Sequence, residues 1–233
     1  MQASERFGDG VDFDKDGIAD ELTRGDITAA TLVQVAMEVP GRVIPHNPVV
    51  EQAIRNGERL FTQIGCASCH VPGLTLNNPI YSEPNPYNPA GNLRVGDVPH
   101  PFTFDLTRQG PLPRLERTAD GTAIVRAFTD LKRHKMGPLC NNEKLVQAGV
   151  PTDQFITKKL WGFYSEPPFL HHGRCTTVTE AIQAHGGEAA AAEQAWAALR
   201  QDQKKALFQF LKSLQVLPPG SPSLSVDETG QPR

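Results

Sequence analysis

Apolar residues recur every three or four positions in several stretches of the chain, which is the pattern of helices with one buried face. This spacing predicts helices over residues 25–39, 47–63, 176–187, 188–199 and 201–216. The stripe of the second helix consists of Val50, Ala53, Leu60, Phe61 and Ile64, and that of the last helix consists of Leu207, Phe208, Leu211 and Leu214. We therefore expect a mainly α fold.

Local end signals support the short helix at 176–187. Thr177 and Glu180 have the spacing of a capping box, in which each side chain bonds the backbone N–H of the other residue. Gly186 and Gly187 follow and stop the helix. Its two ends are thus predicted from sequence alone.

Other stretches contain no such pattern. Residues 71–125 contain too many prolines for regular elements, and a loop of this length usually covers a functional surface. Residues 218–233 have the composition of a disordered tail. With 20 Pro, 20 Gly and only 7% aromatic residues, the fold is expected to have long irregular loops and to need a metal, a disulfide or a large apolar cofactor to organise it.

The charge pattern excludes some classes of function. The net charge is -3, from 23 basic and 26 acidic side chains, and no basic run of five residues occurs, so nucleic acid is not expected as a partner. No window of 18 apolar residues predicts a membrane span. The first ten residues, "MQASERFGDG", lack the apolar core of a signal peptide.

The segment "GCASCH" at residues 65–70 carries the clearest chemistry. Structural zinc would need a second pair of ligands with matching spacing, and Cys140 and Cys175 are 35 residues apart. A thioredoxin-type dithiol would need a strand before it, whereas a helical stripe precedes Cys66. Covalent haem c remains: Cys66 and Cys69 form thioethers to the two vinyl groups, and His70 binds the iron.

A haem iron that transfers electrons needs a sixth ligand, usually Met or His. Spacing does not choose among the candidates Met37, Met136, His46, His100, His134, His171, His172 and His185.

An acidic loop precedes the first helix. Asp12, Asp14, Asp16 and Asp20, with Gly17, match ligand positions of a calcium loop, and the carbonyl of Ile18 would add a further ligand. Thr23 stands where an EF-hand has its bidentate Glu. The sequence leaves two readings open, a loop stiffened by Ca2+ and a solvated acidic turn.

Residues 158–189, "KKLWGFYSEPPFLHHGRCTTVTEAIQAHGGEA", resemble the C-terminal half of the bacterial di-haem cytochrome c peroxidase and MauG superfamily. They are closest to its di-haem thiol oxidoreductase branch, and "LKRHKMGP" at 131–138 resembles that branch's "HDMG" segment. The resemblance runs from about residue 45 to 215. The last helix also resembles the C-terminal helix of cytochromes c, which crosses the helix before the C-x-x-C-H motif.

The resemblance implies a ligand set. In the peroxidases, the C-terminal haem takes its sixth ligand fourteen residues after the His of the "FHDG" motif, a position that falls on His185. The iron is therefore expected to be bis-histidine, with His70 and His185 as ligands and Met136 as the alternative. His171 and His172 become candidates for a supporting role near the haem.

Two kinds of departure from the family qualify this picture. His172 replaces the family's Asp, and Cys175 replaces an Ala, which leaves open a disulfide between Cys175 and Cys140 in an oxidising periplasm. Relatives carry two haems, whereas this chain has one C-x-x-C-H and matches the C-terminal half alone. The second haem would lie on another chain or outside this piece, or the protein only carries electrons.

We therefore expect an N-terminal segment with the calcium-like loop at 1–44, a cytochrome c-like haem domain at 45–217 and a disordered tail at 218–233. The expected function is electron transfer through one six-coordinate haem, within or to a larger multi-haem oxidoreductase. The alternative is hydrogen peroxide reduction, as a domain or subunit of a di-haem peroxidase, so whether the chain is itself an enzyme stays open. Either reading implies a redox partner protein or a second haem-bearing chain. Either reading also implies a periplasmic or otherwise exported location.

Overall fold

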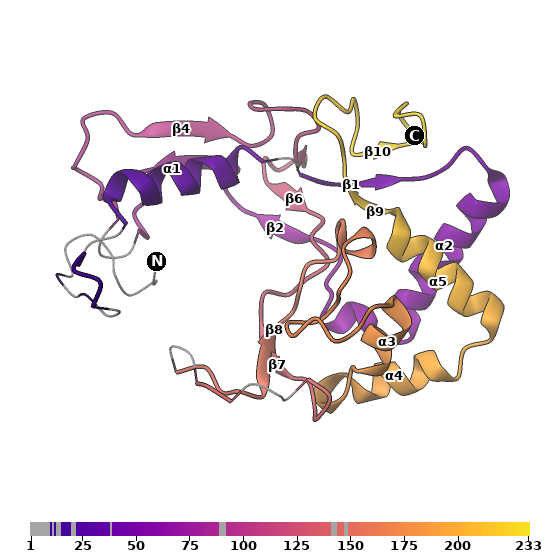
Figure 1. Cartoon of the computed structure of the whole chain (residues 1–233). Coiled ribbons are helices and arrows are strands. Elements are labelled where there is room, and N and C mark those ends of the chain that lie inside the picture. Colours follow the sequence, from indigo (N-terminus) through magenta and orange to yellow (C-terminus); the bar gives the residue numbers. More distant parts are fainter. Residues whose placement is uncertain are drawn as a thin grey trace.

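The computed structural model describes residues 10, 12, 15–19, 22–37, 39–88, 92–140, 144–146 and 149–233. Its helices are α1 (Arg24–Val35), α2 (Pro48–Gln63), α3 (Val178–Gln183), α4 (Ala190–Ala197) and α5 (Gln201–Ser213), with 3-10 turns η1 (Cys66–Ser68), η2 (Phe163–Ser165) and η3 (Gly187–Ala189). Four of the five α-helices lie within the predicted stretches, and α1 begins one residue before its predicted start at residue 25. In Figure 1, α1 and β4 lie at one end of the molecule, and α2 and α5 lie at the other.

The prediction of a mainly α fold is wrong. The structure is only 30% helical and is 17% strand, in several small sheets. The strands are β1 (Pro40–Val43), β2 (Leu74–Leu76), β3 (Ile80–Glu83), β4 (Phe102–Asp105), β5 (Glu116–Arg117), β6 (Ala123–Val125), β7 (Arg133–Lys135), β8 (Gln154–Ile156), β9 (Leu214–Val216) and β10 (Ser225–Val226). Strands of two to four residues are too short to show the alternation that predicts a strand.

These strands form four separate sheets in the described part of the chain. Their orders are β10-β1-β9, β2-β6-β5, β3-β4 and β7-β8. Five of these ten strands, β2 to β6, belong to the span for which the prolines predicted no regular elements. In the β7–β8 pair, His134 lies opposite Phe155.

The main hydrophobic core lies where α2 crosses α5. Asn47 caps the start of α2 by accepting from the N–H groups of Val49 and Val50. Gly57 allows the close approach, because a Cβ at this position would lie 2.1 Å from the carbonyl oxygen of Ala206. Around it pack Ile54, Phe61, Phe128, Leu160, Trp196, Leu207, Phe210, Leu211 and Leu214. Burying each large apolar side chain contributes about 2 kcal/mol, so this crossing anchors the domain.

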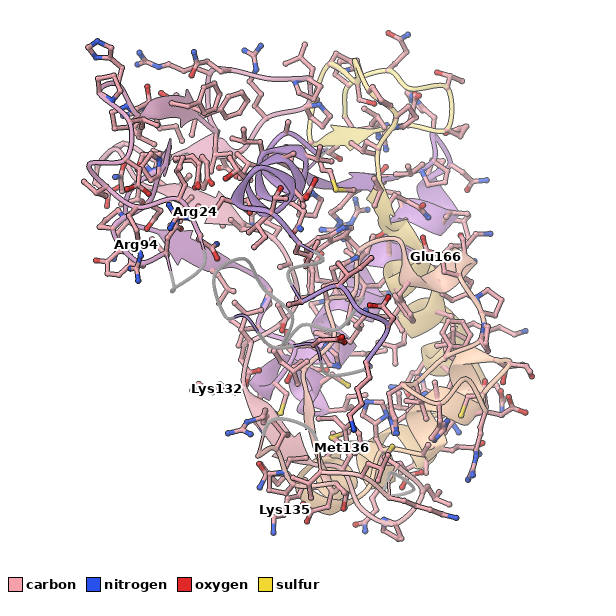
Figure 2. The ribbon with its side chains drawn as sticks, turned by 60° about the vertical axis from the view of Figure 1, so that its left-hand side comes forward. Arg24, Arg94, Lys132, Lys135, Met136 and Glu166 are labelled. Atoms are coloured by element: carbon pink, nitrogen blue, oxygen red, sulfur yellow. The ribbon has the colours of Figure 1, made fainter. Side chains whose placement is uncertain are left out.

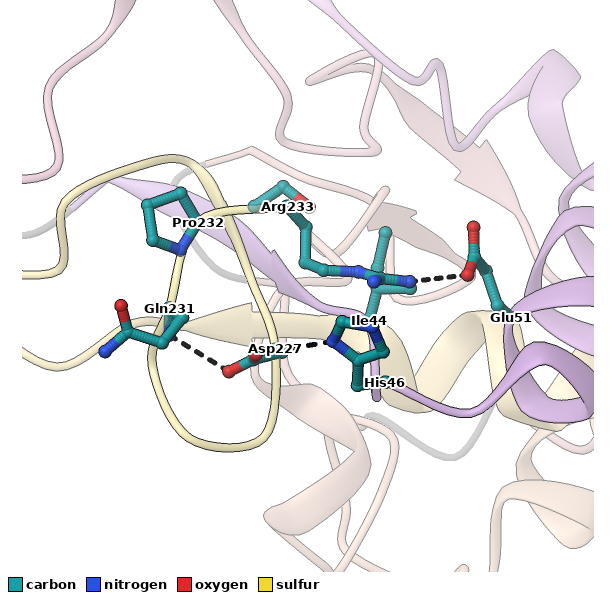
Figure 3. Close-up of a pocket in the computed structure, with 8 residues that line it drawn as sticks. Ile44, His46, Glu51, Asp227, Gln231, Pro232 and Arg233 are labelled. Carbon is teal, nitrogen blue, oxygen red and sulfur yellow. Dashed lines mark hydrogen bonds and ion pairs between the residues drawn. The ribbon is translucent and has the colours of Figure 1, made fainter.

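The prediction of a disordered tail also differs from the structure. Strand β10 pairs in parallel with β1, and Leu217 and Val226 are almost fully buried. Asp227 lies 3.9 Å from His46, and the guanidinium of Arg233 bonds the carboxylate of Glu51 across an open pocket (Figure 3). Composition missed these contacts because they join residues about 180 positions apart.

The short helix α3 has the predicted capping box. The hydroxyl of Thr177 accepts from the N–H of Glu180, and the carboxylate of Glu180 accepts from the N–H groups of Thr176 and Thr177. None of the helices in the described part of the chain combines the length and the apolar character that crossing a bilayer requires.

Candidate haem site

The C-x-x-C-H motif directly follows α2. Gly65 takes a left-handed conformation with φ of 91°, which turns the chain out of α2 and into η1. The N–H of His70 donates to the carbonyl of Cys66 at 3.0 Å, so Cys66 and Cys69 lie on one tight turn beneath the histidine. Burial raises the pKa of the Cys66 thiol to about 11, so unmodified Cys66 is a neutral thiol.

The His70 ring is held among aromatic side chains. Its ring centre lies 6.3 Å from that of Phe61, and its Nδ1 lies 3.0 Å from the carbonyl oxygen of Phe128. A carbonyl only accepts, so Nδ1 carries the proton and Nε2 keeps its lone pair. Burial lowers the pKa of His70 to about 4. The neutral imidazole with a free Nε2 is the form that binds a metal.

His185 has a similar environment at the end of α3. Its Nδ1 lies 2.7 Å from the carbonyl oxygen of Ala181, one helical turn earlier. Burial lowers the pKa of His185 as well. The second imidazole is therefore also neutral and also keeps the lone pair of Nε2.

The structure brings these two imidazoles together from positions 115 residues apart in sequence (185 − 70). Their ring centres are 6.4 Å apart and their planes differ by 44°. Metal–nitrogen bonds of about 2 Å, with about 1 Å from each nitrogen to its ring centre, place two imidazoles on one metal with centres about 6 Å apart. The pair, beside two cysteines on one turn, fits a covalently attached haem.

Met136, the alternative ligand, has other contacts. Its carbonyl accepts from the N–H of Gly186 at 3.0 Å. Its half-buried side chain packs on the second apolar cluster, formed by Cys140, Phe169, Cys175, Ala181 and Ala184. Figure 2 shows Met136 in the same part of the molecule as Lys132 and Lys135, well away from Arg24 and Arg94. The backbone of Met136 therefore lies near His185, while its side chain packs on the second apolar cluster.

His171 and His172 do not join the histidine pair. The exposed His171 ring stacks on Phe155 at 4.0 Å, and the Nε2 of His172 lies 3.3 Å from the carbonyl oxygen of Leu139. Their position beside a haem stays a prediction. Cys140 and Cys175 are free, buried thiols in the second apolar cluster.

A third histidine, His134, was one of the eight candidates for the sixth ligand, and the structure places it in a hydrogen-bond network that the sequence did not predict. Nε2 of His134 lies 2.8 Å from Asp130, and its Nδ1 lies 2.8 Å from Glu188. The side chain is only 15% exposed, and the hydrogen bond to Glu188, followed by that to Asp130, raises the pKa of His134. Cys69, Asp130 and His134 have side-chain ligand atoms within 4.8 Å of one another. The network therefore lies beside Cys69, the second cysteine of the C-x-x-C-H motif.

The acidic loop is described only in part. Asp12 accepts from the N–H groups of Lys15 and Gly17, and Asp16 accepts from that of Ile18. Asp14 and Asp20 lie outside the described residues. The calcium site stays a prediction.

The C-x-x-C-H motif and the paired histidines together make up a candidate haem site. The protein-family model described as "Di-haem oxidoreductase, putative peroxidase" matches residues 115–214, which confirms the resemblance seen in the sequence. The match covers less than half of the chain and includes His134 and His185, but it leaves out Cys66, Cys69 and His70. It is consistent with a partial C-terminal haem domain of that family. Neither the curated proteins nor the solved structures gave a match.

Proposed function

We propose that the chain carries one haem c, attached through Cys66 and Cys69 and ligated by His70 and His185, and that it transfers electrons. The observation that carries this proposal is the imidazole pair, with ring centres 6.4 Å apart and each Nδ1 bonded to a backbone carbonyl. Attachment of haem c takes place in an exported compartment, so we propose a periplasmic location and a redox protein or second haem chain as partner.

The residues around the site suit electron transfer. Haem iron, when bound, supplies a one-electron change between ferric and ferrous states. The ring of Phe61 lies beside that of His70. Burial keeps both imidazoles neutral, and the backbone carbonyls of Phe128 and Ala181 orient them. Because His70 and His185 are held in place, their geometry would change little between the ferric and ferrous states. With both histidines bound, the iron would have no open position for peroxide.

Peroxide reduction is the second candidate, because the description of the matched family names a peroxidase. It would need one ligand to leave and a nearby acid or base to move protons. The ring of His171 stacks on Phe155, and Nε2 of His172 lies 3.3 Å from the carbonyl oxygen of Leu139. In this reading, the chain would supply electrons to a peroxide-reducing haem elsewhere.

The sixth ligand can be tested by two matched substitutions. His185→Ala should open one iron position, which gives high-spin ferric haem and rapid binding of cyanide or peroxide. Met136→Ala should leave the haem low-spin. A low-spin His185→Ala protein together with a high-spin Met136→Ala protein would falsify the assignment and make Met136 the ligand.

A further inference from the structure

We infer that His134 is a positioning residue for the two axial histidines, and that its hydrogen bonds to Asp130 and Glu188 fix the spacing between His70 and His185. The inference rests on the proposed function, since it concerns the ligands of the same haem. It assigns a role to a network that neither the motif nor the family resemblance identifies.

One end of the network supports His70. Asp130 lies two residues after Phe128, whose carbonyl accepts from His70. Burial acts to raise the pKa of Asp130, but hydrogen bonds from Lys132, Thr157 and His134 outweigh it and lower the pKa to about 2. Asp130 is therefore a carboxylate, with a side chain only 9% exposed, in contact with the ring of His134.

The other end supports His185. Glu188 lies three residues after His185 and accepts from His134 through one oxygen and from the N–H of Lys135 through the other, both at 2.8 Å. The backbone adds a parallel link, from the N–H of Gly186 to the carbonyl of Met136. Segment 134–137 thereby fixes the turn that follows the second ligand.

His134 joins these two ends because both of its ring nitrogens are engaged. An imidazole is rigid, so its two bonds set the separation between Asp130 and Glu188. Removing the His134 ring leaves the carboxylates of Asp130 and Glu188 without the group that bonds both of them, and their negative charges repel each other. The turn at 185–188 then moves relative to residues 128–130, and His185 dissociates more easily from iron.

The test uses the haem-loaded protein and cyanide as the probe ligand. His134→Ala should raise the rate of cyanide binding to ferric haem about tenfold, the change that corresponds to about 1.4 kcal/mol, and should increase the high-spin fraction. His134→Asn, which keeps a donor near the position of Nδ1, should recover part of the difference. His100→Ala, which changes an exposed histidine outside the network, is the matched control and should behave as wild type.

A wild-type rate of cyanide binding in His134→Ala would overturn the inference. A general loss of stability would lower the melting temperature without changing that rate well below the melting point, so both quantities are measured. If His134→Ala does not fold, Glu188→Gln decides the question through the same rate. A wild-type protein that is not low-spin bis-histidine would instead defeat the proposed function, so the two failures are distinguishable.

Discussion

The two histidines of the proposed haem site are supported in different ways. His70 follows a 16-residue helix whose inner face is buried against α5. Its ring lies beside that of Phe61, and its Nδ1 donates to the carbonyl of Phe128. His185 follows a six-residue helix and is held by a capping box, a glycine contact and the His134 network. Apolar packing is non-directional and tolerates small shifts, whereas hydrogen bonds and backbone contacts fix a position closely.

This difference suggests a division of roles. The His70 side, with Cys66, packs against the main hydrophobic core. The His185 side has a smaller apolar cluster, which includes Ala181 and Ala184, and relies also on a few directional contacts, each worth about 1 kcal/mol. His185 is therefore the histidine that substitutions should loosen first.

Gly57→Ala should destabilise the whole domain. Alanine normally favours a helix interior over glycine by about 1 kcal/mol, but here the added Cβ would lie 2.1 Å from the backbone oxygen of Ala206. Separating α2 from α5 should cost about 3 kcal/mol or more. Chemical denaturation measures the loss. Gly25→Ala, where the Cβ meets only the Thr23 side chain at 3.5 Å, is the control, and an equal result for both would contradict the close-packing account.

Gly137→Ala should destabilise the fold less than Gly57→Ala does, but it should disturb the binding of His185 to haem iron more. Gly137 has φ of 80°, and a Cβ there would lie 2.7 Å from the backbone nitrogen of Gly187. The strain should cost about 1–3 kcal/mol and should push the turn after His185 away from β7. Electron paramagnetic resonance should show a new high-spin ferric signal. A purely low-spin spectrum would mean that the glycine contact does not position His185.

Glu180 should make α3 sensitive to acid. Hydrogen bonds from the N–H groups of Thr176 and Thr177 lower the pKa of Glu180 below its ordinary 4.5. A lowered folded-state pKa gives stability that is present above pH 4.5 and is lost as the pH falls through the lower folded value. Wild type should therefore melt slightly above Glu180→Gln at neutral pH, and the difference should vanish in acid. A difference that persists at low pH would rule out the carboxylate as its source.

Much of the fold could be predicted where the signals are local. The stripes of α2 and α5 and the capping box at Thr177 lie within a few residues of one another, so sequence alone located these helices. The sheets left no such signal, because their strands are two to four residues long and β1 pairs with a strand about 180 residues away. The domain therefore contains more sheet, and a more ordered tail, than its composition indicated.

The same distinction applies to the site. C-x-x-C-H is contiguous and predicted haem directly, whereas His185 emerged only from a family resemblance. Asp130, His134 and Glu188 were missed as a network, since hydrogen bonds that join residues 54 positions apart leave no periodic pattern. The segment "LKRHKMGP" was noticed only as a family motif, and its role becomes visible once β7 lies beside η3.

The central claim is one covalent haem with two histidine ligands. The most direct test is the visible and electron paramagnetic resonance spectrum of the chain, expressed with haem-maturation machinery and first checked by intact mass. The account predicts the mass of the polypeptide plus one haem, a low-spin spectrum in both oxidation states and none of the weak long-wavelength absorption of a methionine–ferric iron bond. A bare polypeptide mass, or a haem with methionine absorption, would contradict it.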